Sequence, residues 1–146
     1  MPVSIRRLEP DDREAWLPLW QGYLDFYETS VPDDVTGETW RRIADPVGPI
    51  HGLGAFDATG RLVGFVHYLF HAVTWSASDR CYLEDLFVSA DVRGTSAGRA
   101  LIEAVYRAAD EAGADQVYWL TAHDNTTARR LYDGVGRLTP FVKYQR

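Results

Sequence analysis

The sequence predicts an α+β fold, in which helices pack against a mixed β-sheet. The expected elements follow the order β-α-α-β-β-β-α-β-α-β, a sandwich of helices around that sheet. A strand over residues 82–88, rich in aromatic and branched side chains, leads through a glycine-bearing turn into an amphipathic helix that begins at Ala97. The 146 residues are enough for a single domain, residues 1–146, and too few for two.

The N-terminal third is expected to form a short strand and two helices. Residues 3–8 form the strand, and residues 10–12 provide an N-cap for a first helix that Pro18 should kink or restart. A second short helix opens at residues 36–38 and ends before Pro46.

The end of the first helix, residues 23–28, mixes aromatic side chains with carboxylates. Such a mixture could hold an alkylammonium group by cation–π and charge contacts. The alternative is plain packing of aromatic residues at i and i+4, which is the expected account of Trp16 and Trp20.

Two strands, over residues 50–56 and 61–71, are expected to form a hairpin around a turn at residues 57–60. His67 and His71 lie four residues apart in the second strand. Because no other His or Cys stands at ligand spacing, we expect no metal site there.

The central strand carries two consecutive carboxylates. Period-2 alternation places Glu84 on the same face as Leu86 and Val88, and Asp85 on the opposite face. The helix that follows has its apolar residues at helical spacing, and Gly113 stands where a left-handed cap would end it.

The C-terminal third is expected to supply two strands and a helix. Residues 117–122 form the first strand, and a helix runs from Thr126 to about Gly134. A final strand covers residues 139–144, with Pro140 marking its start or an edge position.

Charge and composition exclude several classes of partner. The net charge is −6, and the first 50 residues hold ten acidic side chains against five arginines. That balance argues against nucleic-acid binding and would attract a cationic partner, although an acidic, solvated surface is the alternative. The single cysteine, Cys81, excludes an intramolecular disulfide. Since no membrane span or signal peptide is evident, we expect a cytoplasmic protein without a membrane partner.

The turn between the central strand and the long helix combines small residues with two arginines, Arg93 and Arg99. Gly94, Ser96 and Gly98 leave backbone N–H groups uncovered where the helix dipole adds partial positive charge, which favours a phosphate or pyrophosphate. The alternative is a tight turn that needs glycine only for backbone freedom. The loop is neither a P-loop nor GxGxxG, so nucleoside triphosphates and dinucleotides are poor candidates.

This turn, R-G-T-S-A-G-R-A, resembles the acetyl-coenzyme A loop of the GCN5-related N-acetyltransferase (GNAT) superfamily, whose pattern is Arg/Gln-x-x-Gly-x-Gly/Ala. Ser96 stands where the middle glycine of that pattern is usual. The order of elements fits the superfamily along almost the whole chain. The resemblance implies the GNAT acyl-CoA N-acyltransferase fold, splayed between the strands over residues 82–88 and 117–122, and acetyl-CoA as co-substrate, released as CoA.

The same resemblance implies which residues contact the co-substrate. Its pantetheine arm would insert beside the central strand, and its diphosphate would lie at the turn. Asn125 is alternatively only the N-cap of its helix. The implied cofactor-binding residues are Leu86, Phe87, Val88, Arg93, Gly94, Thr95, Ser96, Ala97, Gly98, Arg99, Asn125, Ala128 and Tyr132.

Within the superfamily, the chain looks most like the spermidine/spermine N-acetyltransferases, which share its Tyr-Leu-Glu-Asp run before the arginine–glycine loop. The C-terminal half also resembles the yeast Hpa2 type of histone and polyamine acetyltransferase. Glu84, nine residues before Arg93, matches the catalytic glutamate of the polyamine enzymes. Tyr132, seven residues after Asn125, matches their catalytic tyrosine.

The chemistry of acetyl transfer needs these residue types. An alkylammonium with a reference pKa of about 10.4 must lose a proton before its nitrogen attacks a thioester, and Glu84 is the predicted base. The resemblance implies the Val88 N–H as oxyanion donor and Tyr132 as acid for the leaving thiolate. The alternatives are an ion-paired or solvated Glu84 and a Tyr132 that only packs against the sheet. Cys81 lacks a His partner, so we expect direct transfer in a ternary complex.

The predicted function is acetyl transfer to a primary amine of a small cationic, polyamine-like acceptor, bound by Tyr27, Glu28 and Glu84. Two alternatives remain. The acceptor could be a protein lysine, as in histones, a thialysine-like amino acid or an amine drug. The chain could instead be a non-catalytic CoA-binding module. Relatives commonly dimerise through strands near the C-terminus, so a homodimer is also expected.

Overall fold

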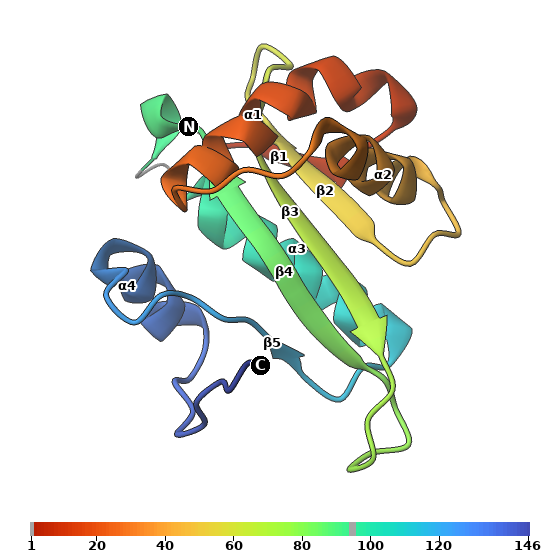
Figure 1. Cartoon of the computed structure of the whole chain (residues 1–146), viewed down its shortest axis with the longest axis vertical. Coiled ribbons are helices and arrows are strands. Elements are labelled where there is room, and N and C mark those ends of the chain that lie inside the picture. The colour runs from red at the N-terminus through yellow and green to blue at the C-terminus, as the bar shows by residue number, and fades with distance from the viewer. Residues whose placement is uncertain (1, 94–95) are drawn as a thin grey trace.

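Five strands form one sheet in the order β1-β2-β3-β4-β5 (Figure 1). The computed structural model describes residues 2–93 and 96–146. The first four strands run antiparallel to their neighbours, and β5 is parallel to β4, so the sheet is mixed as predicted. The strands are β1 (Ser4–Arg7), β2 (His51–Phe56), β3 (Leu62–His71), β4 (Arg80–Val88) and β5 (Val117–Tyr118).

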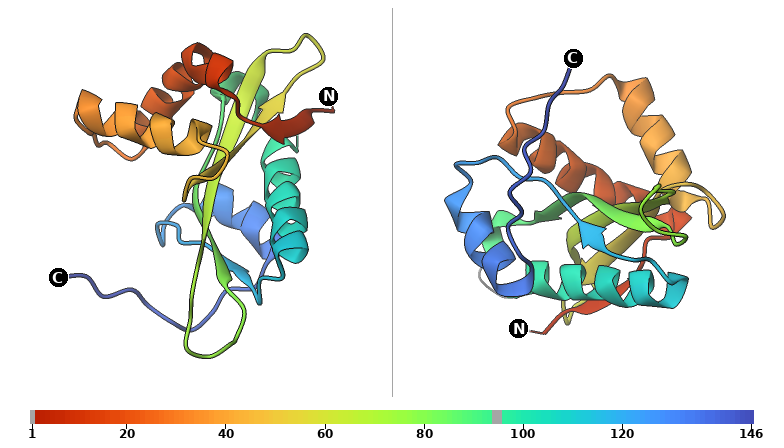
Figure 2. Two further views of the ribbon diagram at one scale, coloured as in Figure 1. Left: turned by 90° about the vertical axis from the view of Figure 1, so that its right-hand side faces the viewer. Right: turned by 90° about the horizontal axis from the view of Figure 1, so that it is seen from below.

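Helices cover both faces of this sheet (Figure 2). Two of them, α1 and α2, pack on one face, and α3 packs on the other, where α4 lies beside it. No helix in the described part of the chain is long and apolar enough to cross a membrane. The helices are α1 (Arg13–Phe26), α2 (Asp33–Ala44), α3 (Ala97–Ala112) and α4 (Thr126–Val135), with short 3-10 turns η1 (Pro10–Asp12) and η2 (Ala90–Val92).

Each face of the sheet has its own hydrophobic core. Under α1 and α2, the indole rings of Trp16, Trp20 and Trp40 are buried against the strands. On the other face, α3 buries one apolar stripe that includes Leu101 and Val105, as its helical spacing predicted. Gly113 ends this helix in a left-handed conformation with φ 74°, which confirms the predicted cap.

The two N-terminal helices differ from the predictions in detail. α1 runs without interruption through Pro18, so the prediction of a restart there is wrong. Packing of Trp16 and Trp20 against the sheet stabilises the helix on both sides of the proline, which outweighs the lost backbone hydrogen bond. α2 begins at Asp33, three residues earlier than predicted, directly after Pro32.

The predicted final strand over residues 139–144 is wrong, because these residues form no strand. A strand needs a partner edge to satisfy its backbone, and the last strand of the sheet, β5, is only two residues long. The C-terminal segment instead leaves apolar side chains in solvent. Phe141, Val142 and Tyr144 are 82%, 76% and 93% exposed.

A register shift interrupts the pairing of β3 with β4. His67 pairs with Asp85, whereas its neighbour Tyr68 pairs with Leu83, so Glu84 is an extra residue in β4. An extra residue of this kind is a β-bulge, which reverses the alternation of faces beyond it.

The bulge changes the face predicted for each carboxylate. Leu83 before it and Leu86 after it both pack toward α3, although they are three residues apart. Asp85 therefore points toward α1, where its carboxylate accepts a hydrogen bond from Tyr23. Glu84 lies on that side as well, so the prediction that placed Glu84 with Leu86 and opposed it to Asp85 is wrong. Period-2 counting cannot detect an inserted residue.

Candidate active site

The edge of β4 that faces β5 is open along most of its length. β5 pairs with β4 only at Cys81 and Tyr82, and the chain then turns away toward α4 (Figure 1). The predicted splay between the two strands is thereby confirmed, although the second strand ends at Tyr118 and not at Ala122.

Backbone geometry directs the amide of Val88 into this splay. The N–H of Ser89 donates to the Val63 carbonyl of β3 at 2.8 Å. In an antiparallel pair successive residues point to alternate sides, so the N–H and C=O of Val88 point away from β3. The Val88 carbonyl accepts a 3.1 Å hydrogen bond from Nε of Arg93. The Val88 N–H therefore points to the β5 side of β4, away from β3.

The start of α3 lies next to this open edge. Ser96 has a left-handed backbone with φ 65° directly before the helix. The first N–H groups of any helix lack an intrahelical acceptor, which leaves the amides of residues 97–99 available to an anion. Gly94 and Thr95, the other two residues predicted in this turn, lie outside the described residues.

Small residues here allow α3 and α4 to approach closely. A Cβ atom on Gly98 would lie 3.2 Å from Cδ2 of Leu131, which is tighter than normal contact. Arg99 extends toward α4 as well, since a Cβ on Gly134 would lie 3.1 Å from its Nη2. Arg93 is the exposed cation on the sheet side of the turn, 5.2 Å from the ring centre of Phe87. Both arginines are exposed, Arg93 before the start of α3 and Arg99 in its first turn.

Glu84 is the one exposed residue of β4. Partial burial of its carboxyl group raises the pKa, and the neighbouring charge of Asp85 raises it further. The ring of Tyr82, two residues earlier on the strand, stacks on Tyr118 at 4.8 Å. Solvent can therefore reach a carboxylate whose raised pKa makes it a stronger base than a free glutamate.

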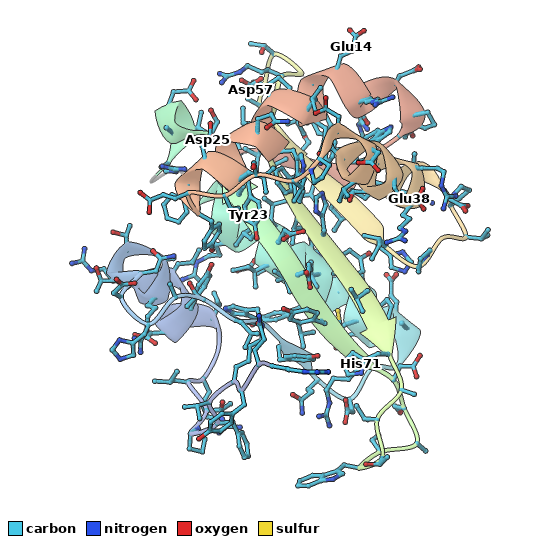
Figure 3. All side chains as sticks on the ribbon, in the orientation of Figure 1. Glu14, Tyr23, Asp25, Glu38, Asp57 and His71 are labelled. Carbon is cyan, nitrogen blue, oxygen red and sulfur yellow. The ribbon has the colours of Figure 1, made fainter. Side chains whose placement is uncertain are left out.

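Asp85 is held by a network that the sequence did not reveal. Oδ1 of Asp85 accepts a 2.7 Å hydrogen bond from the Tyr23 hydroxyl, which reaches from α1 over the sheet (Figure 3). Oδ2 lies 2.9 Å from Nδ1 of His67 on β3. Nε2 of His67 accepts a 3.1 Å hydrogen bond from the indole of Trp16. No sequence spacing links these four residues, because the contact depends on the bulge.

Tyr132 lies on the opposite side of the splay, on α4. Burial raises the pKa of its phenol to about 12, so the hydroxyl stays protonated at neutral pH. Its ring packs edge-on against Trp119 at 5.5 Å. Asn125 occupies the N-cap position of the same helix, but its side chain donates to Oγ1 of Thr121 at 3.2 Å and makes no cap. Ala128 lies in the first turn of α4, partly buried.

The end of α1 closes the acceptor side of the site. Burial raises the pKa of the Tyr27 phenol. Glu28 has φ 53°, in the left-handed region, and lines a shallow polar hollow with Asp25, Thr29 and Ser30. The charge of Asp85 also raises the pKa of Tyr27, so the end of α1 lies beside the carboxylate pair.

The Cys81 thiol lies on the face of the sheet opposite Glu84. Cys81 is fully buried on the α3 face, and burial raises the pKa of its thiol to about 11. Among residues 2–93 and 96–146, no group of three or more His, Cys, Asp or Glu side chains could hold a metal ion.

An open strand edge beside a helix N-terminus, with a carboxylate on one side and a phenol on the other, fits an acyl-CoA-dependent N-acyltransferase. The chain belongs to the acetyltransferase (GNAT) family, which its residues 10–136 match. It is an acyltransferase, and acetyl-CoA is its co-substrate.

Relatives and solved structures agree with this assignment. The chain is 41% identical over 145 residues to the D-amino-acid N-acetyltransferase HPA3 of Saccharomyces cerevisiae, covering 99% of this chain and 90% of that protein. Its fold is similar to the ribosomal-protein-alanine N-acetyltransferase of Brucella melitensis biovar Abortus 2308, with a TM-score of 0.83, 23% identity and coverage of 100% and 99%. It is also similar to AAC(6')-Iy in complex with the bisubstrate analogue CoA-S-monomethyl-acetylneamine, with a TM-score of 0.86, 21% identity and coverage of 100% and 98%.

Proposed function

We propose that this protein acetylates a primary amine of a small cationic acceptor, a polyamine being the first candidate, by direct attack within a ternary complex. The observation that carries the proposal is the pair of adjacent carboxylates, Glu84 and Asp85, on the sheet face beneath the aromatic end of α1. Two carboxylates beside tyrosine rings suit an alkylammonium by charge and by cation–π contact.

Further acidic groups would bind the rest of a polyamine. Glu28 and Asp25 line the hollow at the end of α1, next to Tyr27. A second ammonium several bonds away from the reacting nitrogen would be attracted to these carboxylates at the end of α1. This arrangement supports a linear, multiply charged amine over a compact one.

The first step joins the amine nitrogen to the thioester carbonyl carbon. Glu84 removes a proton from the ammonium, directly or through a water, and so frees the lone pair that attacks. Acetyl-CoA supplies the electrophilic carbonyl. The Val88 N–H, pointed into the splay, donates to the oxygen that becomes negative in the tetrahedral intermediate.

The second step breaks the bond between carbon and sulfur. The thiolate of CoA leaves and takes a proton from the Tyr132 hydroxyl, which is protonated at neutral pH. The nitrogen of the tetrahedral intermediate carries one proton more than the amide, and this proton passes to solvent as the carbon–sulfur bond breaks. Solvent reprotonates Tyr132, and Glu84 releases the proton of the first step to solvent, so charge and atoms balance. The contributing groups are thus Glu84 as base, Val88 as oxyanion donor and Tyr132 as acid.

A thiol-release assay with acetyl-CoA and a panel of amines tests the proposal. The panel holds spermidine, a D-amino acid, a lysine-containing peptide and an aminoglycoside. Turnover with spermidine at the highest kcat/KM supports the proposal, and turnover confined to the peptide or the aminoglycoside contradicts it. Calorimetry with CoA separates a failure of acceptor choice from a failure to bind the co-substrate.

An amino acid is the second candidate acceptor. The 41% identity to the yeast D-amino-acid N-acetyltransferase favours it. An α-amino acid brings one ammonium for Glu84 and Asp85, and its carboxylate would need a cation such as Lys143, whose charge acts on Glu84. A higher kcat/KM for the D-amino acid than for the other amines of the panel would favour this candidate. Loss of that preference in Lys143→Met would decide for it.

We also propose a homodimer formed through the C-terminal segment. Leu138, Phe141 and Val142 are exposed in a stretch without secondary structure. Exposed apolar groups in one contiguous segment are typical of an interaction surface. Light scattering on the full chain and on Phe141→Asp tests this proposal: a dimer that becomes a monomer supports it, and a monomer in both cases contradicts it.

A further inference from the structure

His67 lies in a setting where an imidazole must have both nitrogens bonded. The side chain is only 1% exposed. Its ring stacks on Phe65 at 4.5 Å and lies 5.7 Å from Trp20. A polar ring in such aromatic surroundings costs free energy unless each nitrogen has a partner.

The two partners fix the protonation state of this histidine. The Trp16 indole N–H can only donate, and it donates to Nε2 of His67 at 3.1 Å. Nε2 therefore carries no proton, which excludes the imidazolium and leaves the neutral form with its proton on Nδ1. That Nδ1–H donates to Oδ2 of Asp85 at 2.9 Å. The contact is a neutral hydrogen bond and not an ion pair.

The Asp85 carboxylate is consequently held from two elements at once. His67 on β3 donates to Oδ2, and Tyr23 on α1 donates to Oδ1 at 2.7 Å. Both donors are neutral, so neither cancels the negative charge of the carboxylate. Burial, and then the charge of Asp85, raise the pKa of the Tyr23 phenol, which keeps that donor protonated. The Asp85 side chain is 13% exposed, so the carboxylate is not fully closed off from solvent.

We propose that His67 is a positioning residue, locked by Trp16 as the neutral Nδ1–H tautomer, which fixes the Asp85 carboxylate beside Glu84 as a second anionic contact for the acceptor ammonium. This inference rests on the proposed function, because it gives Asp85 the same acceptor. Asp85 binds and orients the ammonium, while Glu84 takes the proton. With Glu84 alone, the acceptor ammonium would bind more weakly and the direction of its N–H bonds would not be fixed.

The charge of Asp85 also acts on Glu84 itself. It is the second cause, after burial, of the raised pKa of Glu84. A base with a raised pKa is better matched to an ammonium at neutral pH. Fixing Asp85 therefore serves both the binding of the acceptor and the removal of its proton.

Two substitutions at His67 separate its two hydrogen bonds. In His67→Asn the amide nitrogen stands near Nδ1 and still donates to Asp85, while the Trp16 contact is lost. In His67→Gln the amide oxygen stands near Nε2 and still accepts from Trp16, while the donor to Asp85 is lost. Each variant deletes one hydrogen bond and leaves one polar partner, so their thermal stabilities should be similar. A purely structural role predicts similar kinetics as well.

We expect the two variants to differ in the kinetics of the amine alone. His67→Gln should lower kcat/KM for the amine ~10- to 100-fold, mostly through a raised KM, and should leave the KM for acetyl-CoA within about twofold. His67→Asn should stay within about threefold of the parent. His51→Phe is a matched histidine control on the α3 face, where His51 stacks on Tyr68 at 5.1 Å, and it should not change the amine kinetics. Equal losses in the Asn and Gln variants, or no loss in either, overturn the inference.

Nitrogen-15 NMR of the histidine side chains tests the tautomer without any turnover. We expect the spectrum of the parent to contain one imidazole in the neutral Nδ1–H form, and this signal to be absent from His67→Gln. An imidazolium or an Nε2–H tautomer at His67 overturns the inference. If the parent acetylates no amine in the panel, the proposed function fails and the acceptor role of Asp85 fails with it. If the parent is active and His67→Asn and His67→Gln have the same amine kinetics, only this inference fails.

Discussion

Glu84 and Asp85 are consecutive in the chain, yet both carboxylates lie on the face of the sheet that α1 covers. An ordinary strand would direct neighbouring side chains to opposite faces. The extra residue in β4, opposite the His67–Tyr68 step of β3, removes that alternation. The result is a pair of neighbouring carboxylates, one of them exposed, on a strand whose edge is open beyond Tyr82.

Replacing Glu84 by glutamine should remove the base and keep the fold. We expect Glu84→Gln to lower kcat by ~10²- to 10⁴-fold while CoA affinity stays near that of the parent. The matched control is Glu14→Gln, an exposed glutamate in the first turn of α1 (Figure 3), which should leave kcat unchanged. Steady-state kinetics and calorimetry with CoA check this, and a parental kcat would remove Glu84 from the mechanism.

The pH dependence of the reaction should report the same carboxyl group. Because the pKa of Glu84 is raised, its active, ionised form is lost as pH falls through that raised value, and kcat/KM falls with it. In Glu84→Gln this acidic limb should disappear, and the rate should climb with pH toward the amine pKa of about 10.4. An unchanged acidic limb in the variant would assign it to another group.

Glu84→Gln should lower the activity but should not lower the stability of the fold at neutral pH. A carboxyl group whose pKa is raised in the folded state binds its proton more tightly there than in the unfolded chain. Ionisation therefore costs stability as pH rises from the unfolded pKa through the folded one, and that cost persists at neutral pH. Glu84→Gln removes the ionisation, so its melting temperature at neutral pH should equal or exceed that of the parent. A lower melting temperature would show that the carboxylate also stabilises the fold.

Tyr132→Phe should slow acetyl transfer without unfolding the protein. The pKa of about 12 keeps the phenol protonated across the neutral range, so its loss should lower kcat at every pH by ~10²-fold. Tyr106→Phe is the matched control, because the Tyr106 hydroxyl donates a 2.6 Å hydrogen bond to the Val135 carbonyl at the end of α4. That control should lose about 1 kcal/mol of stability and little activity. If Tyr132→Phe instead lowers only the melting temperature, Tyr132 serves packing alone.

Much of this fold could be predicted from local patterns in the sequence. The stripe of α3 and the cap at Gly113 follow from helical spacing and from glycine's access to positive φ, and both were confirmed. The splay between β4 and β5 was expected from the family resemblance, and the two-residue β5 confirms it. Such features depend on residues close together in the chain or on a shared pattern.

The parts that could not be predicted depend on long-range contacts. The residues around Glu84 have the strand propensity of a regular strand, so only the pairing of β3 with β4 reveals the bulge. The hydrogen bond from Trp16 to His67 joins residues 51 positions apart. The sequence pattern of residues 139–144 suits a strand, but it cannot show whether a partner edge exists.

Arg93→Ala should weaken the binding of CoA. The Arg93 side chain is exposed beside the start of α3, and its Nε is held by the Val88 carbonyl at 3.1 Å, which directs the guanidinium to the place proposed for the diphosphate. We expect the Kd for CoA to rise ~10-fold and its dependence on salt to decrease, because one charge-assisted contact is lost. Arg107→Ala, an exposed arginine further along α3, is the control and should leave the Kd unchanged. Equal effects in both variants would mean a general charge effect.

Cys81→Ala should retain acetyl transfer, because the reaction does not pass through an acyl-cysteine. The thiol is fully buried on the α3 face, away from Glu84, and burial raises its pKa to about 11, so it stays a poorly nucleophilic thiol at neutral pH. The variant should lose about 1 kcal/mol of stability through the vacated space and keep kcat within about twofold. Initial rates at varied acetyl-CoA and amine should give intersecting lines, as a ternary complex requires. Parallel lines for the parent, together with an inactive Cys81→Ala, would instead assign a covalent intermediate to this sulfur.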